Sequence, residues 1–175
     1  MRPWVVDVGF QAVDIAALVR KGNNQLRIVI EHGGWSGDPQ LMLAETRVMG
    51  LFALGEDRRT ILRPRETAPT GSWTEHGYPF YSGSAAYSQT VELSDFTRAQ
   101  RVVVRAERPA DMAEFVINGA SAGTRAWAPF EVEITPLVRP GSNAGEIRVT
   151  NSLSNMLLSD PRPSGLLGGA SIVID

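Results

Sequence analysis

The residues that could do acid–base chemistry here are two histidines and a pair of glutamates. His32 and His76 each follow a glutamate, in "EHGG" and "EHGY", but neighbouring strand residues point to opposite faces, so these histidines are expected to be solvated loop residues. Glu131 and Glu133 in "FEVEI" have a spacing within the roughly 5 to 10 Å that separates glycosidase carboxylates. They lie on the outward face of an ordinary amphipathic strand, and we therefore expect no catalytic residues.

Aromatic and arginine side chains in loops could instead bind a sugar, because a ring stacks on a pyranose while polar groups bond its hydroxyls. The candidates are Trp73, Tyr78, Tyr81, Arg125 and Trp127. Trp73 stands in a Gly-Ser-Thr setting and is predicted to be the best exposed aromatic. For Trp127, in "WAPF", packing in the core is the favoured alternative; for Tyr78 and Tyr81, which flank a Pro-Phe pair, it is packing at the sheet edge.

Charge and composition exclude several classes of partner. The formal net charge of -2 provides no basic patch for nucleic acid or an anionic membrane surface. Without cysteine, the chain has no disulfide, thiolate metal site or cysteine nucleophile. The first residues lack the features of a signal peptide, which predicts a cytoplasmic protein as written, or a secreted or periplasmic one if the chain is a fragment of a larger enzyme.

The candidate side chains must be positioned by strands, because hydrophobicity alternates with a period of two. In "AYSQTVEL" one face is predicted to carry Tyr87, Gln89, Val91 and Leu93. Further strands are predicted in "RVVVRAER", "MAEFVI" and "FEVEI", and at 44–54, 58–63, 145–151 and 169–174. The pair Asn118-Gly119 favours a type I′ hairpin turn. About eight short strands predict an all-β fold, either a β-sandwich or a jelly roll.

An internal repeat joins two distant parts of the chain. The stretch "VDIAALVRKGNNQLRIVI" near the N-terminus is restated as "VEITPLVRPGSNAGEIRV" after residue 131. Each copy is predicted to be an inward strand, a short connector, a Gly-Asn turn and a returning strand. Nothing like "FVINGASAGTRAW" precedes the first copy, which is therefore expected to lack a partner hairpin.

The second copy and its surroundings resemble a known family. The stretch "AEFVINGASAGTRAWAPFEVEITPLVRPGSNAGEIRVTNS" is similar to the galactose-binding-like jelly-roll modules of large glycoside hydrolases, in particular the sugar-binding domain of family 2. With "GYPFYSGSAAYSQTVEL", "TNSLSNMLLSD" and "PSGLLGGASIVI" it resembles, more narrowly, the C-terminal β-sandwich of rhamnosidase-like enzymes of family 106. The likeness runs from about residue 40 to the C-terminus.

The resemblance implies a division of the chain and a context. Residues 1–37 are expected to be a partial β-segment, similar to the tail of a preceding β-sandwich domain, and residues 38–175 a galactose-binding-like jelly roll. Jelly rolls of this type often hold a structural calcium ion, for which Asp38, Asp160 and Asp175 are possible ligands; no other cofactor is expected.

Three functions remain open at this point. The first is a non-catalytic carbohydrate-associated module, an accessory or remnant domain of a rhamnosidase-like glycoside hydrolase. The second is a structural module that packs on a catalytic domain and binds no free sugar. The third is an independent glycosidase, which has the least support because in the family the catalytic carboxylates lie on a separate barrel. The partner is thus a carbohydrate or a glycoside hydrolase catalytic domain, and the oligomeric state is open.

Overall fold

The computed structural model describes residues 12–29, 47–67, 69–93, 100–158 and 161–175. The chain divides into two compact units, residues 1–48 and 49–175, which are treated separately below. The domain boundary predicted after residue 37 lies outside the described residues, as do His32, Asp38 and Asp160.

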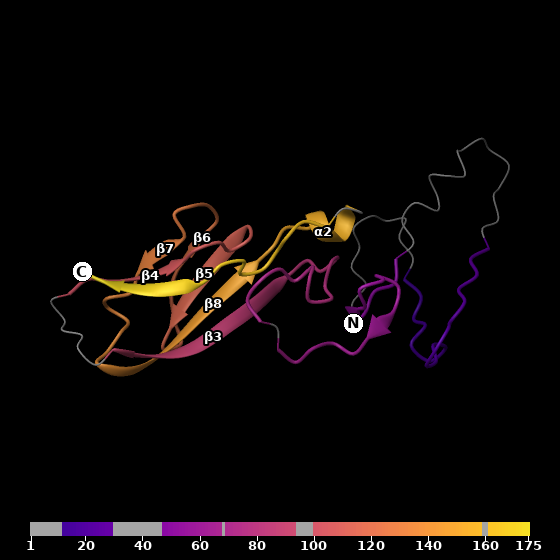
Figure 1. Ribbon diagram of the computed structural model, residues 1–175, viewed down its shortest axis with the longest axis horizontal. Coiled ribbons are helices and arrows are strands. Elements are labelled where there is room, and N and C mark those ends of the chain that lie inside the picture. The colour runs from indigo at the N-terminus through magenta and orange to yellow at the C-terminus, as the bar shows by residue number, and fades with distance from the viewer. Residues whose placement is uncertain (1–11, 30–46, 68, 94–99, 159–160) are drawn as a thin grey trace. The chain divides into compact units, whose positions relative to one another are not determined.

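Residues 49–175 form the predicted β-sandwich. One antiparallel sheet has the order β3-β8-β5-β6, with bounds Ser84–Leu93, Gly141–Thr150, Met112–Ile117 and Ala120–Arg125. The other has the order β7-β4-β9, with bounds Glu131–Glu133, Val102–Ala106 and Ala170–Ile174. Figure 1 shows β3, β8 and β5 side by side, with β4 and β9 in the second layer.

Alternating side chains from both sheets build one core. The core cluster includes Phe115 and Ile117 of β5, Val149 of β8, and Val102 and Val104 of β4. Because successive strand residues point to opposite faces, each strand contributes every second side chain. Full burial of such side chains is the largest favourable contribution to folding, at about 1.5 to 3 kcal/mol each.

The predicted hairpin is confirmed. Asn118 and Gly119 have φ of 50° and 84°, both positive, as a type I′ turn requires. The strand that follows, β6, pairs with β5 from Ile117–Ala120 to Ala113–Arg125, with a register irregularity after Phe115. The hairpin thereby places Arg125 at the end of β6 and Trp127 in the next loop.

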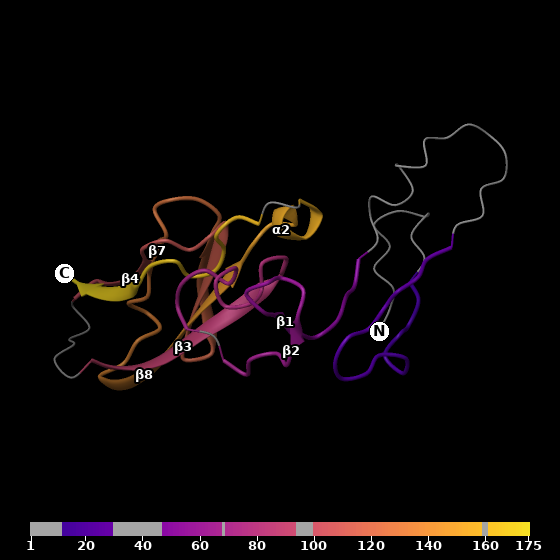
Figure 2. The same cartoon turned by 45° about the vertical axis from the view of Figure 1, so that its right-hand side comes forward.

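Some element bounds differ from the prediction. β8 begins at Gly141, earlier than predicted, because all ten of its residues pair with β3. In the predicted strands 44–54 and 58–63 the described strand residues are β1 (Ala53–Leu54) and β2 (Ile61–Leu62), a small pair labelled in Figure 2. A single helical turn, α2 (Ser154–Leu157), was not predicted. In the described part of the chain, no helix is long and apolar enough to cross a membrane.

The internal repeat has the same turn in both copies. In the second copy Asn143 closes the turn: its Oδ1 accepts from the Arg139 amide at 3.0 Å, and its Nδ2 donates to the carbonyls of Arg139 and Gly141 at 2.7 and 2.9 Å. In the first copy Asn24 makes the corresponding three bonds with Arg20 and Gly22 at 2.9, 2.7 and 2.9 Å. The predicted supersecondary unit is therefore confirmed at its turn.

Candidate functional site

The expectation that Trp73 is exposed is wrong. Its side chain belongs to the core cluster and is 2% exposed. The indole Nε1 donates to the hydroxyl oxygen of Tyr87 at 2.7 Å, and the ring meets Tyr81 edge-on with centroids 5.3 Å apart. No ring face is left on which a sugar could stack.

The reason is the way its loop folds over the sandwich. The Trp73 amide donates to the Ser164 carbonyl at 2.8 Å, and the Gly71 amide to the Leu166 carbonyl at 2.7 Å. A Cβ at Gly165 would lie 2.5 Å from Nε1 of Trp73, so glycine lets the backbone lie against the indole. The polar, glycine-rich sequence around Trp73 predicts a loop correctly, but it does not predict what the loop covers.

Tyr78 and Tyr81 lie near Trp73, and the hydroxyl group of each makes a hydrogen bond with the backbone. The half-buried Tyr78 accepts a hydrogen bond from the Arg65 amide at 2.8 Å, and Tyr81, which is 39% exposed, donates to the Ser84 carbonyl at 2.8 Å. With Trp73 they line an open cavity of about 1080 Å³ whose other walls are largely apolar residues of β3, β5, β8 and β9. The lining also includes polar side chains, among them Arg65, Glu66, Gln89 and Glu146.

The favoured prediction for Trp127, packing in the core, is also wrong. The side chain is 77% exposed. Phe130, three residues later, takes the inward position: it packs against the core in line with Val132 and Ile134. Between the two aromatics the chain turns at the cis peptide bond Ala128-Pro129. The "WAPF" segment thus puts one aromatic inside the sandwich and leaves the other outside.

Trp127 and Arg125 border one surface hollow of about 350 Å³. Its walls are Arg101, Val103 of β4, Arg125 of β6, residues 127–129 of the loop, and residues 131–133 of β7. Ligand pockets in proteins run from about 300 to 1,000 Å³, so the hollow is at the small end of that range. Of the five predicted sugar-binding residues, the structure brings only Arg125 and Trp127 together here.

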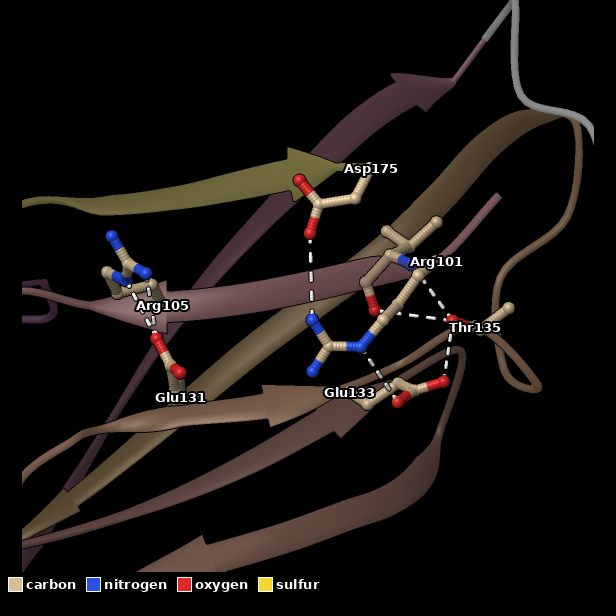
Figure 3. Close-up of polar contacts among 7 residues, drawn as sticks. Arg101, Arg105, Glu131, Glu133, Thr135 and Asp175 are labelled. Carbon is tan, nitrogen blue, oxygen red and sulfur yellow. Dashed lines mark hydrogen bonds and ion pairs between the residues drawn. The ribbon is translucent and has the colours of Figure 1, made fainter. Parts of the chain in front are cut away.

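The two glutamates of the hollow are held by arginines of the neighbouring strand. Glu131 pairs with Arg105, directly opposite in the register, at 2.9 Å, and Glu133 accepts from Nε of Arg101 at 3.1 Å. Figure 3 shows both pairs beside the strands of the three-stranded sheet, with Asp175, the residue after β9, reaching Arg101. Because these side chains are largely exposed, each pair contributes at most about 1 kcal/mol.

Sequence reasoning missed Arg101 and Arg105. A signal for them exists in "RVVVRAER", where Arg101 and Arg105 alternate with Val102 and Val104 and lie on the opposite face of the strand. Once β7 is paired with β4, this alternation places positive charges beside Glu131 and Glu133.

The remaining candidates were a histidine for acid–base chemistry and acidic residues for a calcium site. His76 lies with Nε2 3.4 Å from the Thr70 carbonyl, a contact within its own loop. Within the ranges that the structure covers, no three acidic or histidine side chains gather as a metal site. Asp175 pairs with Arg101 at 3.6 Å; the calcium site it was predicted to share with Asp38 and Asp160 stays a prediction.

Comparisons with known proteins place this sandwich among glycoside hydrolases. A curated relative from Formosa agariphila, named "Putative beta-glucuronidase", is 31% identical over 96 residues, which are 52% of this chain and 8% of that protein. The solved rhamnosidase from Novosphingobium sp. PP1Y is 27% identical with a TM-score of 0.50, over 57% of this chain and 12% of that one. No family model matches the sequence. The matched part is thus a small fraction of each relative, and this chain contains a β-sandwich of the kind found in glycoside hydrolases.

Proposed function

We propose that this chain is a non-catalytic, carbohydrate-associated β-sandwich module of a rhamnosidase-like glycoside hydrolase, and that it binds glycan in the hollow beside Trp127. The observation that carries the proposal is the position of Trp127, a residue that is 77% exposed and that lines the same hollow as Arg125. A solvent-exposed indole offers a flat apolar surface to a pyranose, and the guanidinium offers donors to its oxygens.

The affinity expected of such a site is low. A single stacked ring and a few hydrogen bonds exchanged with water yield little net free energy. A Kd in the millimolar range corresponds to about -4 kcal/mol.

The non-catalytic part of the proposal rests on the state of the carboxylates. Glycoside hydrolysis needs an acid and a nucleophile or base across a cleft. Glu131 and Glu133 instead lie on one strand, and each is paired with an arginine of β4. We therefore expect no hydrolysis of nitrophenyl rhamnosides or galactosides by this chain.

The test is a titration of the full chain with a panel of oligosaccharides, followed by calorimetry. We expect millimolar binding of at least one glycan, lost in Trp127→Ala. Phe80→Ala serves as the matched control, because Phe80 is an aromatic that is 40% exposed and does not border the hollow. Binding that survives Trp127→Ala contradicts the proposed site.

The alternative function is a structural module that packs on a glycoside hydrolase catalytic domain and binds no free sugar. It is favoured by the small share of the rhamnosidase that the match covers, 12%. Absence of binding to every glycan in the panel would support this alternative. Turnover that disappears when one carboxylate is replaced would contradict both functions.

A further inference from the structure

The charged side chains around the Trp127 hollow differ in whether they have a partner of opposite charge. Glu131 and Glu133 both have arginine partners, Arg105 and Arg101, at 2.9 and 3.1 Å. Arg101 also meets Asp175 at 3.6 Å. These two arginines and three carboxylates are paired with one another, and together they carry a net charge of -1.

Arg125 is the exception. Its Nη1 donates to the carbonyl of Thr124, the preceding residue, at 2.9 Å. Within the described residues its guanidinium has no ion pair with a carboxylate. A guanidinium has five N–H donors arranged as a planar fork, so most of its donors remain for a ligand.

We infer that the saccharide bound beside Trp127 is an acidic one, whose carboxylate pairs with Arg125 while the sugar ring lies against the indole. This inference rests on the proposed function and specifies the class of ligand: a hexuronate rather than a neutral hexose. A carboxylate matches the fork of a guanidinium in shape and charge, whereas a hydroxyl matches neither. With Arg125 included, the arginines and carboxylates around the hollow carry a net charge of zero, so the preference for an acid arises from the local pairing with Arg125 and not from the overall charge of the hollow.

The preference for an acid should be modest and sensitive to salt. Exposed ion pairs contribute about 0.2 to 1 kcal/mol, which corresponds to a preference of about 1.5- to fivefold. In about 0.01 M salt the Debye length is about 30 Å, and in about 1 M salt it is about 3 Å. The contribution of the charge therefore fades at high salt, while the contribution of stacking stays.

The test compares two ligands that differ only in charge. The full chain is titrated with trigalacturonate and with its methyl ester, in which each carboxyl group is esterified and therefore carries no charge. At low salt the acid should bind about 1.5- to fivefold more tightly than the ester, and at about 1 M salt the two should bind equally. Arg125→Gln should abolish the preference, so that acid and ester bind equally at low salt. Arg63→Gln, a change of an exposed arginine outside the hollow, should leave the preference intact.

The outcomes separate this inference from the proposed function. Equal binding of acid and ester at low salt, or a preference that survives Arg125→Gln, overturns the acidic ligand while the glycan module stands. If neither form binds while a neutral glycan does at Trp127, the acidic ligand is again wrong. If no glycan of any kind binds, the proposed function fails and this inference fails with it.

Discussion

The two copies of the repeat have the same turn in different surroundings. In both, the amides of a leucine and a valine donate to an isoleucine carbonyl, Ile15 in the first copy and Ile134 in the second, at 2.9 and 3.2 Å. In both, an asparagine closes the turn next to a glycine with positive φ.

Their burial is opposite. Ile134 is fully buried. Asn143 is 3% exposed, and its Oδ1 also accepts a hydrogen bond from Nδ2 of Asn118 at the tip of the β5–β6 hairpin. In the first copy Val13 and Leu18 are 76% and 77% exposed, and Asn24 is exposed too. The sequence of the turn therefore determines its hydrogen bonds, whereas the neighbouring strands determine its burial.

That residues 1–37 are a partial β-segment and residues 38–175 the jelly-roll domain stays a proposal, and residues 12–29 include none of the strands predicted for the first copy. The apolar side chains of the first copy correspond to core side chains of the second, yet no described residue before Ala53 is buried. Such a face is expected to favour association with another surface.

The largest difference is expected for the isoleucines. Ile134→Ala should lower the free energy of unfolding by about 2 to 5 kcal/mol, because it leaves a cavity in the core. Ile15→Ala should change it by less than about 1 kcal/mol, since Ile15 is only half-buried. Urea unfolding followed by the fluorescence of the core tryptophan measures both, and equal losses would show that the two copies are equally buried.

The asparagines should differ by less. Asn143→Ala removes both the turn bonds and the contact with Asn118 from a buried site, at a cost of about 1 to 3 kcal/mol. Asn24→Ala removes the same turn bonds from an exposed site, and we expect a change within about 0.5 kcal/mol in the same unfolding transition. A loss for Asn24→Ala that matches the loss for Asn143→Ala contradicts the contrast.

The glycines test the backbone alone. Gly22 and Gly141 have φ of 97° and 87°, and a Cβ on either would meet no atom within 4 Å. Alanine at either position is therefore strained only by its conformation, by about 1 to 2 kcal/mol. Gly141→Ala should lower the unfolding free energy of the sandwich by this amount. Gly22→Ala should leave that transition unchanged while shifting the NMR signals of residues 15–24.

A third turn sharpens the comparison because it too is closed by a side chain in solvent. The hydroxyl of Thr60 donates to Asp57 at 2.6 Å, and with the amides of Arg59 and Thr60 it lowers the pKa of Asp57 from 3.8 to about 2. Since the folded pKa is depressed, any stabilisation is complete above pH 3.8 and is lost as the pH falls through 2. An NMR titration should find this midpoint, and Thr60→Val should move it back towards 3.8. A midpoint near 3.8 in the unaltered protein would mean that these bonds do not persist.

What the sequence predicted well depends on residues close together along the chain. The period-two pattern located β3, β4, β5 and β9 within a few residues, and Asn118-Gly119 predicted the hairpin. Both signals arise within a single strand or turn, where the geometry of the backbone leaves few choices.

What it predicted badly depends on contacts between distant segments. Trp73 looked exposed because its neighbours are polar, but residues 164–166 bond its loop and bury its ring. Trp127 looked buried because "WAPF" enters a core strand, but Phe130 fills that position. The candidate site thus depends on contacts between segments that no local pattern reveals. The ion pairs of Arg101 and Arg105 with the glutamates of β7 likewise depend on the pairing of β4 with β7.

The central claim, that glycan contacts Trp127 and not the aromatic cluster around Trp73, can be tested by one NMR titration. The full chain is labelled with nitrogen-15 so that each indole N–H gives a signal of its own, which is assigned by single Trp→Phe variants, and a glycan that binds is added to saturation. We predict that the Trp127 signal shifts along a millimolar binding curve, while the Trp73 signal, whose N–H is bonded to Tyr87, stays in place. A shift of the Trp73 signal with a stationary Trp127 signal would contradict the claim.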